Sequence, residues 1–221
     1  MPVRFATMEI VPRNAATVAE EAYRLPKPDI TVFISSNAVR HGIEHADSSQ
    51  IAVVGPASAE AVVAAGRKVE IMPIGGFDSE HLLTMAELYD VAGKRVRIIR
   101  GDGGRELLAN TLRSRGAEVD YLSVYKRALP LYRADEVEAL LTDWRAGKVN
   151  AVTIMSVATL ENLITLLPES ALPMLTRTPL VTPADRVIKQ VMEQLPGMPT
   201  TLADATDAAA MVRGIVRAID G

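Results

Sequence analysis

Short apolar runs alternate along the chain with longer segments in which apolar residues recur at helical spacing. The clearest example begins at residues 96–100, an apolar run typical of a buried strand. The glycines of residues 101–104 allow a tight turn, and residues 107–115 then have a helical period that ends at Gly116. Residues 118–126 follow as a second, longer strand. Alternation places four of its side chains on one face: Val119, Tyr121, Ser123 and Tyr125.

The same alternation of strand and helix extends over the rest of the chain. Further strands are expected at residues 4–10, 29–34, 51–54, 69–72, 151–155, 180–182 and 200–202. Helices are expected after Asn14, after Ser35-Ser36-Asn37, from residues 55–58 to Gly66, at 79–88 and 135–146, from Ser156 to residue 167, from Pro183 to residue 195, and at 206–219. Strands that alternate with helices predict parallel sheets with helical crossovers.

Two stretches of the chain match each other, which indicates an internal duplication. Residues 32–39 correspond to residues 152–159, and residues 54–57 correspond to residues 181–184. The second copy opens with a strand and a helix, whereas the first copy begins at its long strand. By symmetry we expect an apolar groove beside residues 151–155, where the C-terminal half lacks that opening strand.

These patterns predict an α/β fold of two doubly wound parallel-sheet lobes joined by a two-stranded β-ladder, with a cleft between the lobes. The ladder is assigned to residues 1–12 and 117–130. The first lobe is assigned to residues 13–116. The second lobe is assigned to residues 131–221 and is incomplete at its N-terminal strand.

Composition narrows the class of protein. Of the 221 residues 48 % are apolar, and the mean hydropathy of +0.14 fits a buried core. A net charge of −3 does not favour a general polyanion-binding surface. The chain has no cysteine, which excludes disulfides, thiolate catalysis and zinc–thiolate sites. With no apolar run long enough to span a bilayer and no signal-peptide pattern, we expect a soluble, cytoplasmic protein.

Several strand-to-helix turns carry small or polar residues at the sheet edge where ligands usually bind. They contain Ser35-Ser36-Asn37, Gly55 to Ser58, Gly101 to Gly104, Ser156, and Thr182-Pro183. Helix N-termini favour anions there, and the number of such turns suggests an anion site. Plain helix capping is the alternative for each turn taken singly.

Three other patterns bear on nucleotide binding, metal binding and catalysis. The glycine-rich turn lacks the lysine-serine ending and full spacing of nucleotide loops. His41 and His45 match an H-x-x-E-H zinc pattern, but no third ligand accompanies them, so a solvated helix face is preferred and no metal is expected. Tyr125 has two readings: an ordinary strand tyrosine, or a phenol directed into the cleft as a hydrogen-bond donor or weak acid.

The chain resembles the uroporphyrinogen-III synthase family. The resemblance is carried by residues 33–39, 52–59, 99–107 and 124–127, in that order. It implies a cofactor-free enzyme that closes linear hydroxymethylbilane into uroporphyrinogen III, with loss of water and inversion of the last pyrrole ring. The substrate carries an acetate and a propionate on each pyrrole, which suits a site rimmed with helix N-termini.

The resemblance also implies roles for individual residues. It places the family's tyrosine on Tyr125 as the catalytic residue. The implied substrate-binding residues are Ser35, Ser36, Asn37, Ser58, Arg100, Gly101, Gly103, Gly104, Ser156 and Thr182. The glycine-rich turn as a whole falls on residues 100–105. The chain departs from the family in having Thr182-Pro183-Ala184-Asp185 where members often have a Gly-Pro or Gly-x-Thr turn, and the acidic Asp185 is unfavourable for binding a carboxylate there. The family's opening strand and helix are also absent.

Two alternatives share the same fold. One is a non-catalytic two-lobed protein that binds a small polycarboxylate, and the other is an inactive, truncated synthase. For the synthase we expect a small-molecule substrate, no cofactor, no nucleic-acid or membrane partner, and a monomer.

Overall fold

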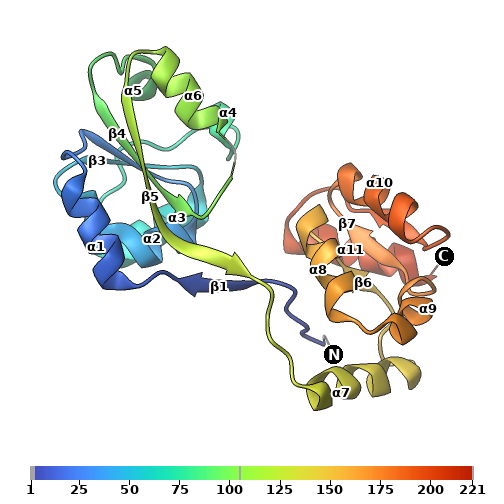
Figure 1. Ribbon diagram of the computed structural model, residues 1–221. Coiled ribbons are helices and arrows are strands. Elements are labelled where there is room, and N and C mark those ends of the chain that lie inside the picture. The colour runs from blue at the N-terminus through green and yellow to red at the C-terminus, as the bar shows by residue number, and fades with distance from the viewer. Residues whose placement is uncertain (1–2, 105, 221) are drawn as a thin grey trace. The chain divides into compact units, whose positions relative to one another are not determined.

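The structure is a computed structural model that describes residues 3–104 and 106–220. The chain divides into two compact units, shown in Figure 1. The central unit is continuous and comprises Ile10–Ala128. The terminal unit combines the residues up to Glu9 with those from Leu129 onward. No helix within the described residues is long and apolar enough to cross a membrane.

A five-stranded sheet forms the middle of the central unit, in the order β1-β5-β4-β2-β3. Its strands are β1 (Glu9–Pro12), β2 (Ile30–Phe33), β3 (Gln50–Val53), β4 (Arg95–Gly101) and β5 (Glu118–Ala128). β2 is parallel to both β3 and β4, and β4 is parallel to β5. β1 lies against β5 at the edge and runs in the opposite direction, which makes the sheet mixed. The strand expected at residues 4–10 therefore starts later than predicted.

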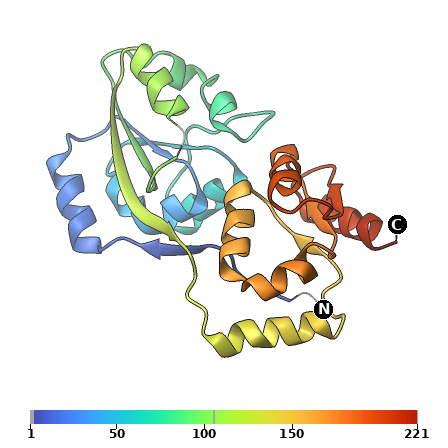
Figure 2. The same ribbon diagram turned by 45° about the vertical axis from the view of Figure 1, so that its right-hand side comes forward.

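Helices cover both faces of this sheet. They are α1 (Ala15–Arg24), α2 (Ser36–Gly42), the 3₁₀ helix η1 (Ile43–Ala46), α3 (Pro56–Ala64), α4 (Ser79–Leu82), α5 (Ala86–Tyr89) and α6 (Leu107–Ser114). Helices α1, α2 and α3 lie on one face of the sheet and α4, α5 and α6 on the other (Figures 1 and 2), and the apolar residues of each set belong to separate core clusters. The helix expected at residues 79–88 is thus two short helices, and the strand expected at 69–72 is a single bridge from Ile71 to Ala52.

The sheet of the terminal unit has three parallel strands in the order β6-β7-β8. They are β6 (Val152–Thr153), β7 (Leu180–Thr182) and β8 (Thr200–Leu202). The helices are α7 (Ala134–Arg145), α8 (Val157–Leu166), η2 (Glu169–Ala171), α9 (Leu172–Leu175), α10 (Asp185–Gln194) and α11 (Ala208–Asp220). The α/β fold class and the parallel pairing expected from the sequence are confirmed, although β6 is shorter than its predicted run.

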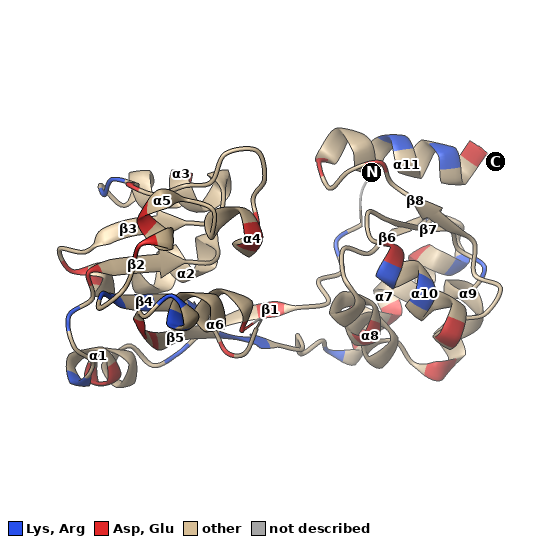
Figure 3. Ribbon diagram, turned by 90° about the horizontal axis from the view of Figure 1, so that it is seen from above, with Lys and Arg blue, Asp and Glu red and all other residues tan. Residues whose placement is uncertain are grey.

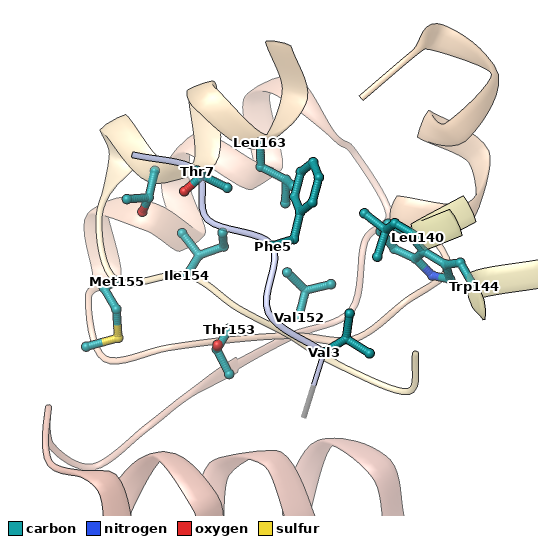
Figure 4. A pocket seen from close by; sticks show the side chains of 11 residues that line it. Val3, Phe5, Thr7, Leu140, Trp144, Val152, Thr153, Ile154, Met155 and Leu163 are labelled. Atoms are coloured by element: carbon teal, nitrogen blue, oxygen red, sulfur yellow. The ribbon is translucent and has the colours of Figure 1, made fainter. Parts of the chain in front are cut away.

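An apolar hollow of about 260 Å³ lies beside β6, the strand for which the symmetry argument predicts a groove. The first described residues run along it, and Figure 4 shows the Phe5 ring pointing toward Leu163 of α8. Phe5 stacks on Tyr132, with ring centroids 4.3 Å apart. Asn162 Nδ2 donates to the carbonyl oxygen of Thr7 at 2.7 Å. These contacts make the segment before Glu9 part of the terminal unit's core.

Phe5→Ala should therefore destabilise the terminal unit by about 1–2 kcal/mol, because a half-buried ring and its stacking partner are lost. The sole tryptophan, Trp144, is buried in this unit and donates its Nε1–H to Thr178 at 2.8 Å. Its fluorescence during urea unfolding measures the change. Tyr23→Ala is the control, since that side chain is 91 % exposed in the central unit. An unchanged midpoint for Phe5→Ala would contradict this role.

Candidate active site

An irregularity in the pairing of β4 with β5 determines where Tyr125 points. Arg100 pairs with Ser123, but Gly101 pairs with Tyr125, so β5 contains one extra residue, Val124. Such a bulge re-aims the side chains beyond it. Tyr125 accordingly packs with Leu122 and Val124 in one core cluster, whereas Tyr121 packs against the other. The predicted common face for Tyr121 and Tyr125 is therefore wrong, because strict alternation ends at the bulge.

The Tyr125 ring lies directly over Gly101. A Cβ atom at position 101 would stand 2.4 Å from Cε2 of the ring, so only glycine fits without displacing the tyrosine. The ring is 1 % exposed. The side chain is thus packed in the core, as an ordinary strand tyrosine would be, while its hydroxyl reaches the turn at the end of β2 and can still act as a donor there.

The Tyr125 hydroxyl forms a hydrogen bond with the hydroxyl of Ser35. The Tyr125 and Ser35 oxygens are 3.2 Å apart, and either can donate. Ser35 is also the N-cap of α2, where its Oγ accepts the amide N–H of Ala38 at 3.1 Å. The predicted capping role is confirmed. Tyr125, Ser35 and Gly101 thus come from three different elements and meet at the carboxyl ends of neighbouring parallel strands, the edge where ligands bind in such sheets.

The glycine-rich turn after β4 has the backbone conformation that its residues predict. Gly103 has φ +70° and Gly104 has φ +129°, a region that favours glycine. The amide of Asp102 donates to the Tyr125 carbonyl at 2.9 Å, which attaches the turn to β5. Arg105 lies outside the described residues. The turn therefore leaves backbone exposed close to Tyr125.

Arg100 points away from Tyr125. Its guanidinium lies 3.6 Å from the centroid of the Tyr121 ring, and Nη1 donates to Glu106 Oε1 at 3.0 Å. Hydrogen bonds from Tyr121 and then from Arg100 lower the pKa of the Glu106 carboxyl below its usual value. Glu106 and Tyr121 were not singled out from the sequence. One feature of the sequence could have indicated the pairing of Glu106 with Arg100: Glu106 is an acidic residue just before α6, six positions after Arg100.

The remaining predicted residues occupy the starts of helices. Ser36 and Asn37 are half-buried in the first turn of α2, and Ser58 is buried in the first turn of α3. In the terminal unit Ser156 caps α8 and accepts from the Thr159 amide at 3.3 Å. The buried Thr182 Oγ1 accepts from the Ala184 amide at 3.2 Å, so α10 starts at Asp185 rather than at Pro183.

No group of three or more histidine, aspartate or glutamate side chains that could hold a metal occurs in the described part of the chain. Lys, Arg, Asp and Glu are interspersed along the ribbons of both units in Figure 3.

Gly101→Ala should destabilise the central unit by about 1–3 kcal/mol, since its methyl group would overlap the Tyr125 ring. Urea unfolding followed by circular dichroism measures the loss. The same substitution in a Tyr125→Leu background serves as the matched control, because a smaller side chain leaves room. Equal losses in both backgrounds would show that the ring contact is not the cause.

Known proteins of one family resemble this chain in sequence. A family profile described as "Uroporphyrinogen-III synthase HemD" matches residues 1–212. The uroporphyrinogen-III synthase of Salmonella typhimurium is 34 % identical over 168 residues, which cover 71 % of this chain and 66 % of that protein. The Escherichia coli synthase is 44 % identical over 91 residues, covering 41 % and 36 %. The chain thus matches less than two thirds of either relative's length.

Solved structures share the fold. The crystal structure of uroporphyrinogen-III synthetase from Helicobacter pylori has a TM-score of 0.66 at 14 % identity, over 95 % of this chain and 90 % of that one. A mutant uroporphyrinogen III synthase from Thermus thermophilus has a TM-score of 0.57 at 19 % identity, over 96 % and 87 %. With the profile matching nearly its whole length, the chain belongs to the uroporphyrinogen-III synthase family.

Proposed function

We propose that this protein closes hydroxymethylbilane to uroporphyrinogen III, with loss of water and inversion of the last pyrrole ring. The family match over residues 1–212 carries the proposal. The hydroxyl pair of Tyr125 and Ser35 supports it, because two residues assigned from the family resemblance lie 3.2 Å apart.

The chemistry assigned to these residues is positional and electrostatic. The substrate's hydroxyl leaves as water, which requires a proton on the departing oxygen. The Ser35 oxygen accepts the Ala38 amide and can donate its own hydrogen to the Tyr125 oxygen, which leaves the Tyr125 hydroxyl hydrogen for a substrate oxygen. A preorganised donor stabilises charge that develops as the C–O bond breaks.

The carboxylates of the substrate are assigned to the helix starts and the glycine turn. Backbone N–H groups at these positions can donate hydrogen bonds to an anion, and a helix start also has the positive end of the helix dipole. Ser36, Asn37, Ser58, Ser156 and Thr182 remain proposed contacts of this kind, as do the exposed Gly103 and Gly104. We further propose that the protein acts in the cytoplasm as a monomer, without cofactor, nucleic acid or membrane.

The isomer formed from fresh hydroxymethylbilane tests the activity. A synthase gives the III isomer, whereas a protein that only binds polycarboxylates, or an inactive member of the family, leaves spontaneous closure to the I isomer. Separation of the oxidised porphyrins by chromatography identifies the product. Formation of the I isomer alone, at every protein concentration, would refute the proposed activity.

Tyr125→Phe should lower kcat at least about tenfold, because the variant keeps the buried ring and loses the donor. Circular dichroism verifies that the fold is retained. Tyr89→Phe is the matched control, since that ring is 69 % exposed. Undiminished turnover in Tyr125→Phe would reduce Tyr125 to a packing role.

A further inference from the structure

A second polar cluster lies at the end of β4, on the face of the sheet opposite to Tyr125. Arg100 stacks on Tyr121, and Glu106 joins them from the start of α6. One Glu106 oxygen accepts from Arg100 Nη1, and the other accepts from the Tyr121 hydroxyl. The three side chains hold each other in a closed arrangement around a single carboxylate.

One hydrogen-bond donor of the Arg100 guanidinium has no partner among the described residues. This donor is the buried Nε, and the Arg100 side chain is only 12 % exposed. Buried polar groups are nearly always paired, and an arginine fork suits a carboxylate that binds through both oxygens. Glu106 engages Nη1 at 3.0 Å while dividing its two oxygens between Arg100 and Tyr121. Arg100 therefore has a donor that Glu106 does not engage.

The surroundings favour an anion. Arg113 stands 5.5 Å from the Tyr121 ring centroid and donates to the Val119 carbonyl at 2.9 Å, and after the hydrogen bonds from Tyr121 and Arg100 its positive charge also helps to lower the pKa of Glu106. Gly104 presents no side chain: a Cβ there would stand 4.0 Å from Arg100 Nη1. Arg100, Arg113 and Glu106 thus surround the Tyr121 ring, and the exposed backbone of Gly104 lies beside them.

Glu106 is well placed to be displaced. Its side chain is 49 % exposed, whereas that of Arg100 is nearly buried, so Glu106 can turn into solvent without opening the core. It stands at the N-cap of α6, where the helix dipole stabilises its charge after release as well. Exchange of one carboxylate for another on Arg100 leaves the number of buried charges unchanged.

We propose that Arg100 and Tyr121 form a carboxylate subsite that Glu106 occupies in the ligand-free protein, and that an acetate or propionate group of the substrate replaces Glu106 there. This inference rests on the proposed function for the identity of the carboxylate. It assigns Glu106 as an internal competitor that lowers affinity, and Arg113 as the second cation of the subsite.

Kinetics with hydroxymethylbilane give the first test. Glu106→Gln removes the competing charge at constant size and should lower KM about two- to fivefold, the range for loss of an exposed ion pair. Arg100→Met should raise KM about tenfold or more, with the apolar stacking on Tyr121 kept. Glu118→Gln is the matched control, because Glu118 pairs with Arg95 at 3.3 Å at the other end of the same strands and should leave KM unchanged.

Direct binding separates this inference from the proposed function. The probe is a monopyrrole with one acetate and one propionate, titrated calorimetrically into each folded variant. Tighter binding to Glu106→Gln and weaker binding to Arg100→Met support the subsite even if no III isomer forms. Equal binding by wild type and Glu106→Gln, together with an equal KM, overturns it even if the protein is an active synthase. Should Arg100→Met fail to fold, the Glu106→Gln comparison alone decides.

Discussion

The close contact between Gly101 and the Tyr125 ring is the constraint on which the site depends. The extra residue in β5 turns the ring toward β4, and only a glycine at position 101 leaves room for it. The hydroxyl then reaches Ser35, which is already fixed by capping α2. A side chain at position 101 would displace the ring and with it the hydroxyl that meets Ser35.

The same bulge separates two kinds of chemistry in adjacent residues. Arg100 and Gly101 are consecutive, yet Arg100 contacts Tyr121 on one face of the sheet and Gly101 contacts Tyr125 on the other. One face therefore presents a neutral pair of hydroxyls, and the other presents a charged cluster. A neutral donor suits assistance to a leaving oxygen, while the charged cluster suits anchorage of a carboxylate.

Local patterns predicted most of the fold and part of the site. Strands such as β2, buried at every residue, and caps such as Ser35 follow from interactions within a few residues, so the sequence contains them. The direction of Tyr125 does not follow, because a bulge arises from how two distant strands pair. The grouping of Arg100 with Glu106 and Tyr121 was missed for the same reason: its members meet only after β4, β5 and α6 have packed.

The division of the chain has a consequence for the order in which the protein forms during synthesis. The central unit is continuous and is complete once Ala128 has left the ribosome. The segment around Phe5 packs against Tyr132, α7 and α8, so it has no partners in the terminal unit until these have been synthesised. Because domains generally fold as units during synthesis, we expect the Tyr125–Ser35–Gly101 cluster to assemble before the terminal unit, whose sequence is split, acquires its structure.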